Sequence, residues 1–493
     1  MKAAVSTLAG AAGLLAALIP GCGGDDPAPQ QPPAPPAITP LERFDPPGCA
    51  FSVAPRPEYT DVTAGRPEVG ATPNIRRVRL GLGGNVAHDV EGRADPSTSI
   101  AFAWQTDDGT FASEVQWGTS PDPATWSAES RINGMTWLTP PGLINDRGAA
   151  RMHEAYLCGL TPNTTYYYRV GGGPAGEEAW SDVYSFKTAP RAGDAEVTIA
   201  VSGDARGQSN DAWQLIQRRV MAEGVDLQVF SGDVANLALD QAEWEQWLDA
   251  AWKDTDGAPL TLGQVLTLPA HGNHEAHSTL YFGNVTMPQD LEHYPLYGEL
   301  FFSFDVGPVH LVVIDDAWVV KPHDEPEFEA VFAEWLRADL EAADANRAEV
   351  PWIVTVHHHS PYSSSAHGED SDVLRGRKFF GPIYDEHHVD LVLAGHDHNY
   401  ERTKPVTTSP EGVPTVQQSF ADGTVYVVCA GAGAPAYSPG MSEFTELSHG
   451  YGSGGAVGVY GTLRATKTSL TLDARELRLD ATDPTFDTLT ITK

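Results

Sequence analysis

Five apolar runs in the middle of the chain each end in polar, ionisable side chains, often next to a glycine. Helical periodicity separates several of these runs, which is typical of an α/β domain. The carboxyl ends of parallel strands meet at one edge of a sheet, so we expect the five ends to form one cluster. In chain order, these ends carry Asp204, Asp233, Asn273 with His274, a His run at 357–359, and the pair His396 and His398.

This set of side chains indicates metal chemistry. Carboxylate and imidazole together suit Zn, Fe, Mn or Co, whereas Mg and Ca prefer oxygen ligands alone. A carboxylate can also bridge two ions, an arrangement that activates water and stabilises a phosphoryl group. Each fragment is weak by itself, because a Gly-Asp pair after a strand is usually a capped turn and a His run can be a solvated edge. The ordered combination, above all the run at 395–398, favours a metal site.

The same motifs resemble the calcineurin-like metallophosphoesterase superfamily. The ending Gly-His-Asp-His-Asn-Tyr-Glu-Arg at 395–402, together with a preceding β-rich region, is similar to purple acid phosphatases. The resemblance implies two divalent or mixed-valence metal ions (Zn, Fe, Mn or Co) and assigns their ligands residue by residue. Asp204 and His398 would hold the first ion; Asn273, His358 and His396 would hold the second, and Asp233 would bridge them.

Within the His run, the spacing from Pro351-Trp352 and the spacing to Tyr362 both select His358. His357 is the second choice, and His359 fits only a shorter His-Ser-Pro pattern. The resemblance also implies that His274 and His367 contact the phosphate oxygens and help to protonate the leaving alkoxide. The alternative for His367 is a loop residue without a catalytic role.

Two positions depart from the family pattern. Purple acid phosphatases carry a metal-binding Tyr three residues after the second Asp, where this chain has Asn236. Other members of the superfamily carry a His two residues after the first Asp, where this chain has Arg206. The first ion therefore lacks its usual extra ligand. Arg206 cannot bind a cation but could pair with a phosphate. Both residues also fit as polar residues at a helix start.

Before the predicted α/β region lies a stretch of alternating apolar and polar residues that predicts short strands. Its Leu-x-Pro-x-Thr-x-Tyr-x-Tyr run at 160–168 resembles fibronectin type III domains. The predicted fold is thus an N-terminal all-β fibronectin type III-like sandwich over 76–190, followed by an α/β metallophosphoesterase domain over 191–455, with layered β-sheets flanked by helices. A C-terminal β segment over 456–493 would complete the catalytic domain.

The first residues resemble a bacterial lipoprotein leader. Residues 1–21 would be the signal peptide and Cys22 the lipidated residue, followed by a Pro-rich tether and linker over 22–75. An ordinary signal peptide is the alternative. We therefore expect a cell-envelope location, with membrane contact only through the lipid anchor. Export allows the three remaining cysteines to form one disulfide, which leaves one thiol free.

The expected activity is hydrolysis of a small-molecule phosphomonoester by in-line attack of a metal-bound hydroxide, as in acid phosphatases. A net charge of −35 argues against nucleic-acid partners. A phosphodiesterase on the same scaffold is one alternative, and assays on paired aryl monoester and diester substrates would separate the two. A non-catalytic surface binding or adhesion protein is the other, and metal content would test it. The substrate, the metals and the oligomeric state do not follow from the sequence.

Overall fold

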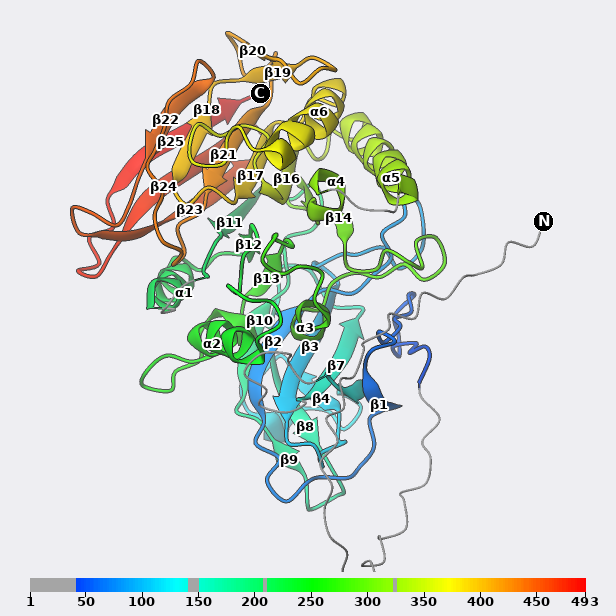
Figure 1. Ribbon diagram of the computed structural model, residues 1–493. Helices are drawn as coiled ribbons and strands as arrows, with labels where there is room; N and C mark the ends of the chain where they lie inside the picture. Colours follow the sequence, from blue (N-terminus) through cyan, green and yellow to red (C-terminus); the bar gives the residue numbers. More distant parts are fainter. Residues whose placement is uncertain (1–40, 141–149, 207–210, 322–325) are drawn as a thin grey trace, which may run out of the picture. The chain divides into compact units, whose positions relative to one another are not determined.

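The computed structural model describes residues 41–140, 150–206, 211–321 and 326–493 (Figure 1). The N-terminal domain consists of two sheets, with strand orders β1-β6-β7-β3-β2 and β10-β8-β4-β5, and β9 pairs with β8. This confirms the predicted all-β domain. Its strands are β1 (Thr60–Ala64), β2 (Arg76–Gly81), β3 (Ser99–Thr106), β4 (Glu114–Gly118), β5 (Arg131–Asn133), β6 (Met135–Leu138), β7 (Arg151–Cys158), β8 (Thr165–Gly172), β9 (Ala179–Trp180) and β10 (Tyr184–Lys187).

The described part of the predicted linker, from residue 41 onward, is folded. β1 pairs with β6, and Phe51 and Tyr59 are buried in a small core together with residues of β7. A disulfide joins Cys49 to Cys158 at the end of β7. The predicted tether and linker over 22–75 therefore does not extend over residues 41–75, which belong to the folded domain. The apolar residues of this part stand singly among prolines and show no helix or strand period, so their burial depends on contacts with β6 and β7.

Two sheets form the framework of the second domain. One has the order β13-β12-β11-β23-β24-β25, and the other has the order β14-β15-β16-β17-β21-β18-β22. The first contains β11 (Glu196–Ser202), β12 (Leu227–Phe230), β13 (Leu266–Pro269), β23 (Ala456–Thr466), β24 (Ser469–Arg478) and β25 (Thr485–Thr492). The second contains β14 (Phe301–Val306), β15 (Val309–Ile314), β16 (Trp352–His359), β17 (Leu391–Gly395), β18 (Tyr400–Thr403), β21 (Val425–Cys429) and β22 (Thr445–His449). A separate hairpin pairs β19 (Val406–Thr408) with β20 (Pro414–Val416).

Within each sheet, the strands that lead to the predicted site are parallel to one another. β11, β12 and β13 are parallel, as are β15, β16, β17 and β21. The C-terminal strand β23 joins the first sheet antiparallel to β11. Apolar side chains from both sheets belong to one continuous core. Parallel strands buried on both faces account for the uninterrupted apolar runs in the sequence.

The helices are α1 (Asp211–Glu223), α2 (Gln241–Trp252), α3 (Thr279–Asn284), α4 (Ala317–Val320), α5 (Pro326–Ala345) and α6 (Ser371–Glu386). α4, α5 and α6 contact β16 of the second sheet, and α1 contacts β23 and β24 of the first (Figure 1). In α2, the Asp240 side chain accepts a hydrogen bond from the N–H of Ala242, and Trp244 and Trp247 are buried. No helix in the described ranges is long and apolar enough to cross a bilayer.

Polar contacts join the two domains. The guanidinium of Arg77 on β2 forms ion pairs with Glu245 and Asp249 of α2, at 3.0 and 2.8 Å. Arg79, buried on the same strand, donates to the backbone oxygen of Asn284 at the end of α3, at 2.7 Å. Because α2 follows the loop that carries Asp233 and α3 follows the loop that carries Asn273, the N-terminal domain supports the elements behind the predicted site.

Candidate metal centre

The predicted strand-end residues come together, but from two sheets rather than from one rim. Asp204, Asp233 and Asn273 follow β11, β12 and β13 of the first sheet, whereas the His run lies at the end of β16 and His396 follows β17 in the second. Hydrogen bonds join the two groups. The N–H of His396 donates to Asp204 at 3.1 Å, and Nδ1 of His358 donates to the backbone oxygen of Ser231 at 2.7 Å.

Three residues at these strand ends have a left-handed backbone. The φ angles of Asp204, Asp233 and His396 are 59°, 59° and 73°. Such conformations are uncommon for residues with a Cβ and are concentrated at functional sites. The neighbouring glycines permit the close approach: a Cβ on Gly272 would lie 2.4 Å from the nitrogen of Asp233, and one on Gly395 would lie 2.4 Å from Oδ2 of Asp204.

The residues predicted for the second ion form a cluster of hydrogen-bond acceptors. Since Nδ1 of His358 donates to Ser231, its Nε2 carries a lone pair. That Nε2 lies 2.9 Å from Oδ1 of Asn273 and 3.3 Å from Oδ1 of Asp233. Nε2 of His396 is buried and has no hydrogen-bond partner among the described residues. Converging acceptors and an unpartnered buried nitrogen fit a bound cation.

Burial keeps the imidazoles of this cluster neutral. It lowers the pKa of His358 to about 4 and the pKa of His396 well below its ordinary value. Neutral imidazole is the form that binds metals. Burial also raises the pKa of Asp204, and the nearby Asp233 carboxylate adds to this effect. For Asp233, burial alone would raise the pKa, but His358, His274 and Arg206 outweigh it and lower the pKa.

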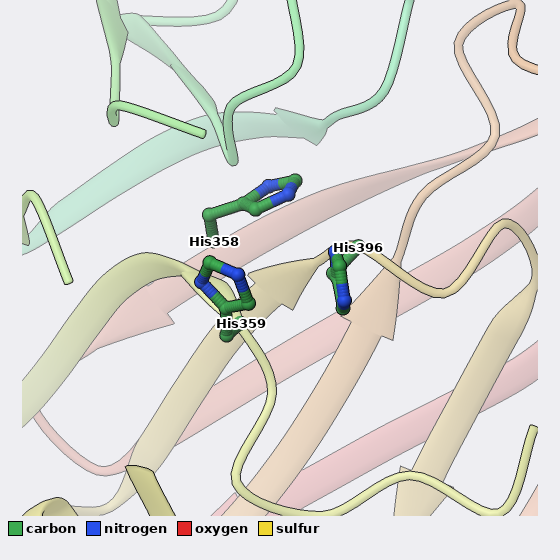
Figure 2. A group of neighbouring side chains, drawn as sticks. All are labelled: His358, His359 and His396. Atoms are coloured by element: carbon green, nitrogen blue, oxygen red, sulfur yellow. The ribbon is translucent and has the colours of Figure 1, made fainter. Parts of the chain in front are cut away.

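The His run divides between two environments. His357 and His359 both face Asp316 through Nδ1, at 3.1 and 3.0 Å, and His357 also stacks on Phe380. Only His358 faces Asp233 and Asn273, because alternate residues of a strand point to opposite sides. Figure 2 shows His359 beside His358 and His396. Its ring centroid lies 5.0 Å from that of His358 and 4.5 Å from that of His396. Sequence spacing did not reveal Asp316, which is fully buried.

The residues predicted for the first ion surround an arginine instead. Nε of Arg206 forms an ion pair with Oδ2 of Asp233 at 2.9 Å. Nη2 of Arg206 lies 3.2 Å from Nε2 of His398, and Nη1 donates to Oδ1 of Asn236 at 3.4 Å. Nδ1 of His398 donates to the backbone oxygen of Pro435 at 2.7 Å, so Nε2 is the acceptor toward Arg206. This set does not fit a cation in the presence of the guanidinium.

Tyr437 completes this side of the site and was not predicted. Its ring stacks on that of His398, with 4.1 Å between the centroids. Tyr362 and Tyr400 face elsewhere, toward Thr408 and Asp487. No motif marks Tyr437, because it lies in a loop remote from the metal-ligand patterns.

His274 and His367 lie beside the cluster. The N–H of His274 donates to Oδ1 of Asp233 at 3.1 Å, and its Nδ1 donates to the backbone oxygen of Asn236 at 2.8 Å. The ring centroid of His367 lies 4.4 Å from that of His396, and its Nδ1 pairs with Asp370 at 2.8 Å. The N–H of His367 donates to Asp397 at 3.1 Å. His367 is therefore held at the site by its neighbours.

Glu275 holds the loop that carries Asp233. Its two carboxylate oxygens accept backbone N–H groups from residues 272, 233, 234 and 235, at 2.7, 2.9, 2.7 and 3.3 Å. The carboxylate is fully buried, and burial raises the pKa of Glu275. Four converging donors stabilise the ionised form. Glu275 thus fixes the backbone on which Asp233 is presented.

A second His/Asp cluster adjoins Asn273. Nε2 of His277 lies 2.8 Å from Asp315, and Nε2 of His271 accepts the N–H of His277 at 2.8 Å. Because Nε2 of His271 is an acceptor, the proton of its neutral ring is on Nδ1, which faces Asp315 at 3.5 Å. No nitrogen lone pair of His271 is left for a metal, so this cluster is a hydrogen-bond network. His271 and His277 line a cavity of about 270 Å³ together with Trp318 and Lys321.

Comparisons with known proteins agree with this architecture. Residues 90–188 match the purple acid phosphatase N-terminal domain, and residues 197–400 match the calcineurin-like phosphoesterase family. Both domains of the chain are thus similar to those of purple acid phosphatases. This confirms the family resemblance and places the chain among metal-dependent phosphoric ester hydrolases. The family uses a centre of two metal ions, and the residues around Arg206 depart from that arrangement.

Several curated relatives are similar over most of their length. Purple acid phosphatase 21 of Arabidopsis thaliana is 28% identical over 374 residues, which cover 72% of this chain and 75% of the relative. Acid phosphatase type 7 of Homo sapiens is 27% identical, covering 68% of this chain and 75% of the relative. Phosphoenolpyruvate phosphatase of Allium cepa is 26% identical, covering 74% and 73%.

Solved structures show the same fold. Purple acid phosphatase PPD1 from yellow lupin (Lupinus luteus) superposes with a TM-score of 0.62 at 18% identity, covering 85% of this chain and 74% of that chain. At such low identity the likeness concerns the fold alone. It agrees with the predicted order of an all-β domain followed by an α/β metallophosphoesterase domain.

Proposed function

We propose that this metallophosphoesterase hydrolyses phosphomonoesters. The observation that carries the proposal is the convergence of acceptor atoms from Asp233, Asn273 and His358 beside the unpartnered Nε2 of His396. A metal ion held there would supply positive charge for the phosphoryl oxygens and make a coordinated water more acidic. The names of the similar curated proteins, which are acid phosphatases, favour a monoester over a diester substrate.

His274 and His367 supply the proton for the leaving oxygen in this proposal. The Nδ1 atom of each ring is tied to an acceptor, Asn236 O for His274 and Asp370 for His367. In the protonated ring, Nε2–H is then the donor left for a substrate oxygen. Both side chains are only partly buried, so a bound ester can reach them. A general acid placed in this way typically accelerates the reaction by about 10²–10⁴-fold.

Parallel assays of the full-length protein on an aryl phosphomonoester and the matching aryl diester test the reaction. We expect the monoester to be turned over faster, and Asp233→Ala to lose at least about 100-fold in kcat/KM together with bound metal. Glu243→Gln, outside the cluster, is the matched control and should retain parental turnover. Faster turnover of the diester would reverse the proposed substrate class. Parental turnover and metal content in Asp233→Ala would remove the cluster from the chemistry.

We also propose that the protein is exported and anchored to the cell envelope through Cys22, which lies outside the described residues. The leader-like sequence at 1–21 motivates this proposal, and the Cys49–Cys158 disulfide supports it, because disulfides persist mainly in oxidising compartments. Cys22→Ser should move the protein from the membrane fraction to the soluble fraction of fractionated cells. A variant that remains as membrane-bound as the parent would refute the anchor.

A further inference from the structure

Both departures from the family pattern fall at the same place in the structure. The second motif has lost its Tyr, and Asn236 stands there; the first motif has gained Arg206. The two side chains are hydrogen-bonded, with Nη1 of Arg206 donating to Oδ1 of Asn236 at 3.4 Å. A cation-binding group has therefore been replaced by a neutral amide, and a permanent cation lies directly against it.

The guanidinium lies against two acceptor atoms that a first metal ion would need. Oδ2 of Asp233 is in an ion pair with Nε, and Nε2 of His398 accepts from Nη2. Oδ1 of Asp233 faces the other way, toward His358 and the N–H of His274. The carboxylate that would bridge two ions thus has one oxygen directed to the second-ion cluster and the other to the guanidinium.

The carboxylate of Asp204 is fully buried and shares a single backbone donor among the described residues. Its two oxygens accept the N–H of His396, at 3.1 and 3.3 Å. It also lies 3.6 Å from Nε2 of His398. A divalent ion at this place would be in contact with a guanidinium that is always protonated, and the two cations would repel each other in a buried environment.

We propose that the guanidinium of Arg206 takes the place of the first metal ion, so that the protein binds a single ion, at Asp233, Asn273, His358 and His396. The inference rests on the proposed phosphomonoesterase site and deepens it. A guanidinium is a planar donor that matches two phosphate oxygens, so Arg206 would hold the phosphoryl group on the side where relatives place an ion. Tyr437, stacked on His398, borders this side of the site.

Metal stoichiometry tests the proposal independently of turnover. The full chain would be stripped with a chelator, reloaded with excess Mn²⁺, desalted and measured by elemental mass spectrometry. We expect one ion per chain for the parent and a rise toward two for Arg206→Ala and for Arg206→Ala combined with Asn236→Tyr. Arg218, on α1, forms an ion pair with Asp254; Arg218→Ala removes the same charge as Arg206→Ala and should stay at one ion. A parent with two ions, or Arg206 variants that remain at one, would overturn the inference.

Two further measurements do not depend on the folding of the Arg206 variants. The electron paramagnetic resonance spectrum of the Mn²⁺-loaded parent should be that of isolated ions, whereas an exchange-coupled pair would contradict the inference. His398→Ala should keep its one ion, because His398 is a partner of Arg206; His396→Ala should lose it. Loss of an ion from the His398 variant would restore His398 as a ligand.

The failure of this inference is distinguishable from failure of the proposed function. A parent that binds two ions and hydrolyses the aryl monoester refutes only the role of Arg206. A parent that binds no ion refutes the metal centre itself, and with it the basis of both proposals.

Discussion

Glu275→Gln tests whether the backbone that presents Asp233 is held by a single buried carboxylate. Each oxygen of Glu275 accepts two backbone N–H groups, from residues 272 and 233 at one oxygen and from residues 234 and 235 at the other. Gln offers one acceptor oxygen, and its amide nitrogen would face two N–H donors. Two buried donors therefore lose their partner.

An unpaired buried N–H costs about 1–3 kcal/mol, so the substitution should lower the free energy of unfolding by about 2–6 kcal/mol. This is a large part of the 5–15 kcal/mol typical of a folded protein. The left-handed backbone of Asp233 (φ 59°) also loses its support. Residues that orient metal ligands without touching the ion usually contribute about 10–100-fold to metal affinity, so we expect metal binding by the Glu275→Gln variant to weaken by that factor.

Urea unfolding followed by tryptophan fluorescence would measure the stability, and competition with a chromophoric chelator would measure metal affinity. Glu243→Gln is the matched control. One oxygen of Glu243 accepts the N–H groups of Asn236 and Leu237, at 2.5 and 2.8 Å, and the Gln oxygen can do the same. Its stability should change by less than about 0.5 kcal/mol. If the two variants behaved alike, Glu275 would not hold the loop.

Three further predictions concern other parts of the fold. His358→Ala should lower metal affinity by more than about 100-fold, and alanine at either flanking histidine should lower it less, as metal titrations of the three variants would show. A larger loss at His357 or His359 would mean that the neighbour, not His358, is the ligand. Burial opposes the charged form of His310, but Asp339 and Asp305 outweigh it and raise its pKa to about 9. The protonated His310 side chain stabilises the folded protein fully below about pH 6.5, the pKa of His in the unfolded chain, and this contribution disappears as the pH rises through 9. The parent should therefore lose about 3 kcal/mol over this range relative to His310→Gln, measured by urea unfolding, and parallel pH profiles would contradict this. Replacing both disulfide cysteines, Cys49 and Cys158, by Ser should cost about 2–5 kcal/mol in the same assay, and an unchanged unfolding midpoint would refute it.

The strand-end residues could be predicted because each apolar run and its terminal motif are local features. A buried parallel strand reads as an uninterrupted apolar run, and the residue after it lies at the sheet edge whichever sheet contains the strand. The division into two sheets could not be predicted in this way. β13 and β16 are both buried along their whole length, and only non-local pairing shows that β13 joins β12 whereas β16 joins β15 and β17.

Residues that act through a neighbour were also missed. Asp316 precedes α4 and has no motif of its own, yet it orients both His357 and His359. Its role depends on β15 lying next to β16, which brings residue 316 to the end of the His run. The same holds for Phe51 and Tyr59, whose burial depends on the small core that they share with β7.

His358 and Arg206 both stand at motif positions, but the motif predicts the contacts of His358 alone. The spacing around His358 selects a residue whose partners are the other predicted ligands, so motif and structure point to the same side chain. Arg206 stands at a motif position too, but its meaning depends on three contacts: with Asp233, with Asn236 and with His398. Sequence alone shows a lost ligand and a gained charge as separate changes. In the structure they are one change, because the gained charge lies against the position of the lost ligand.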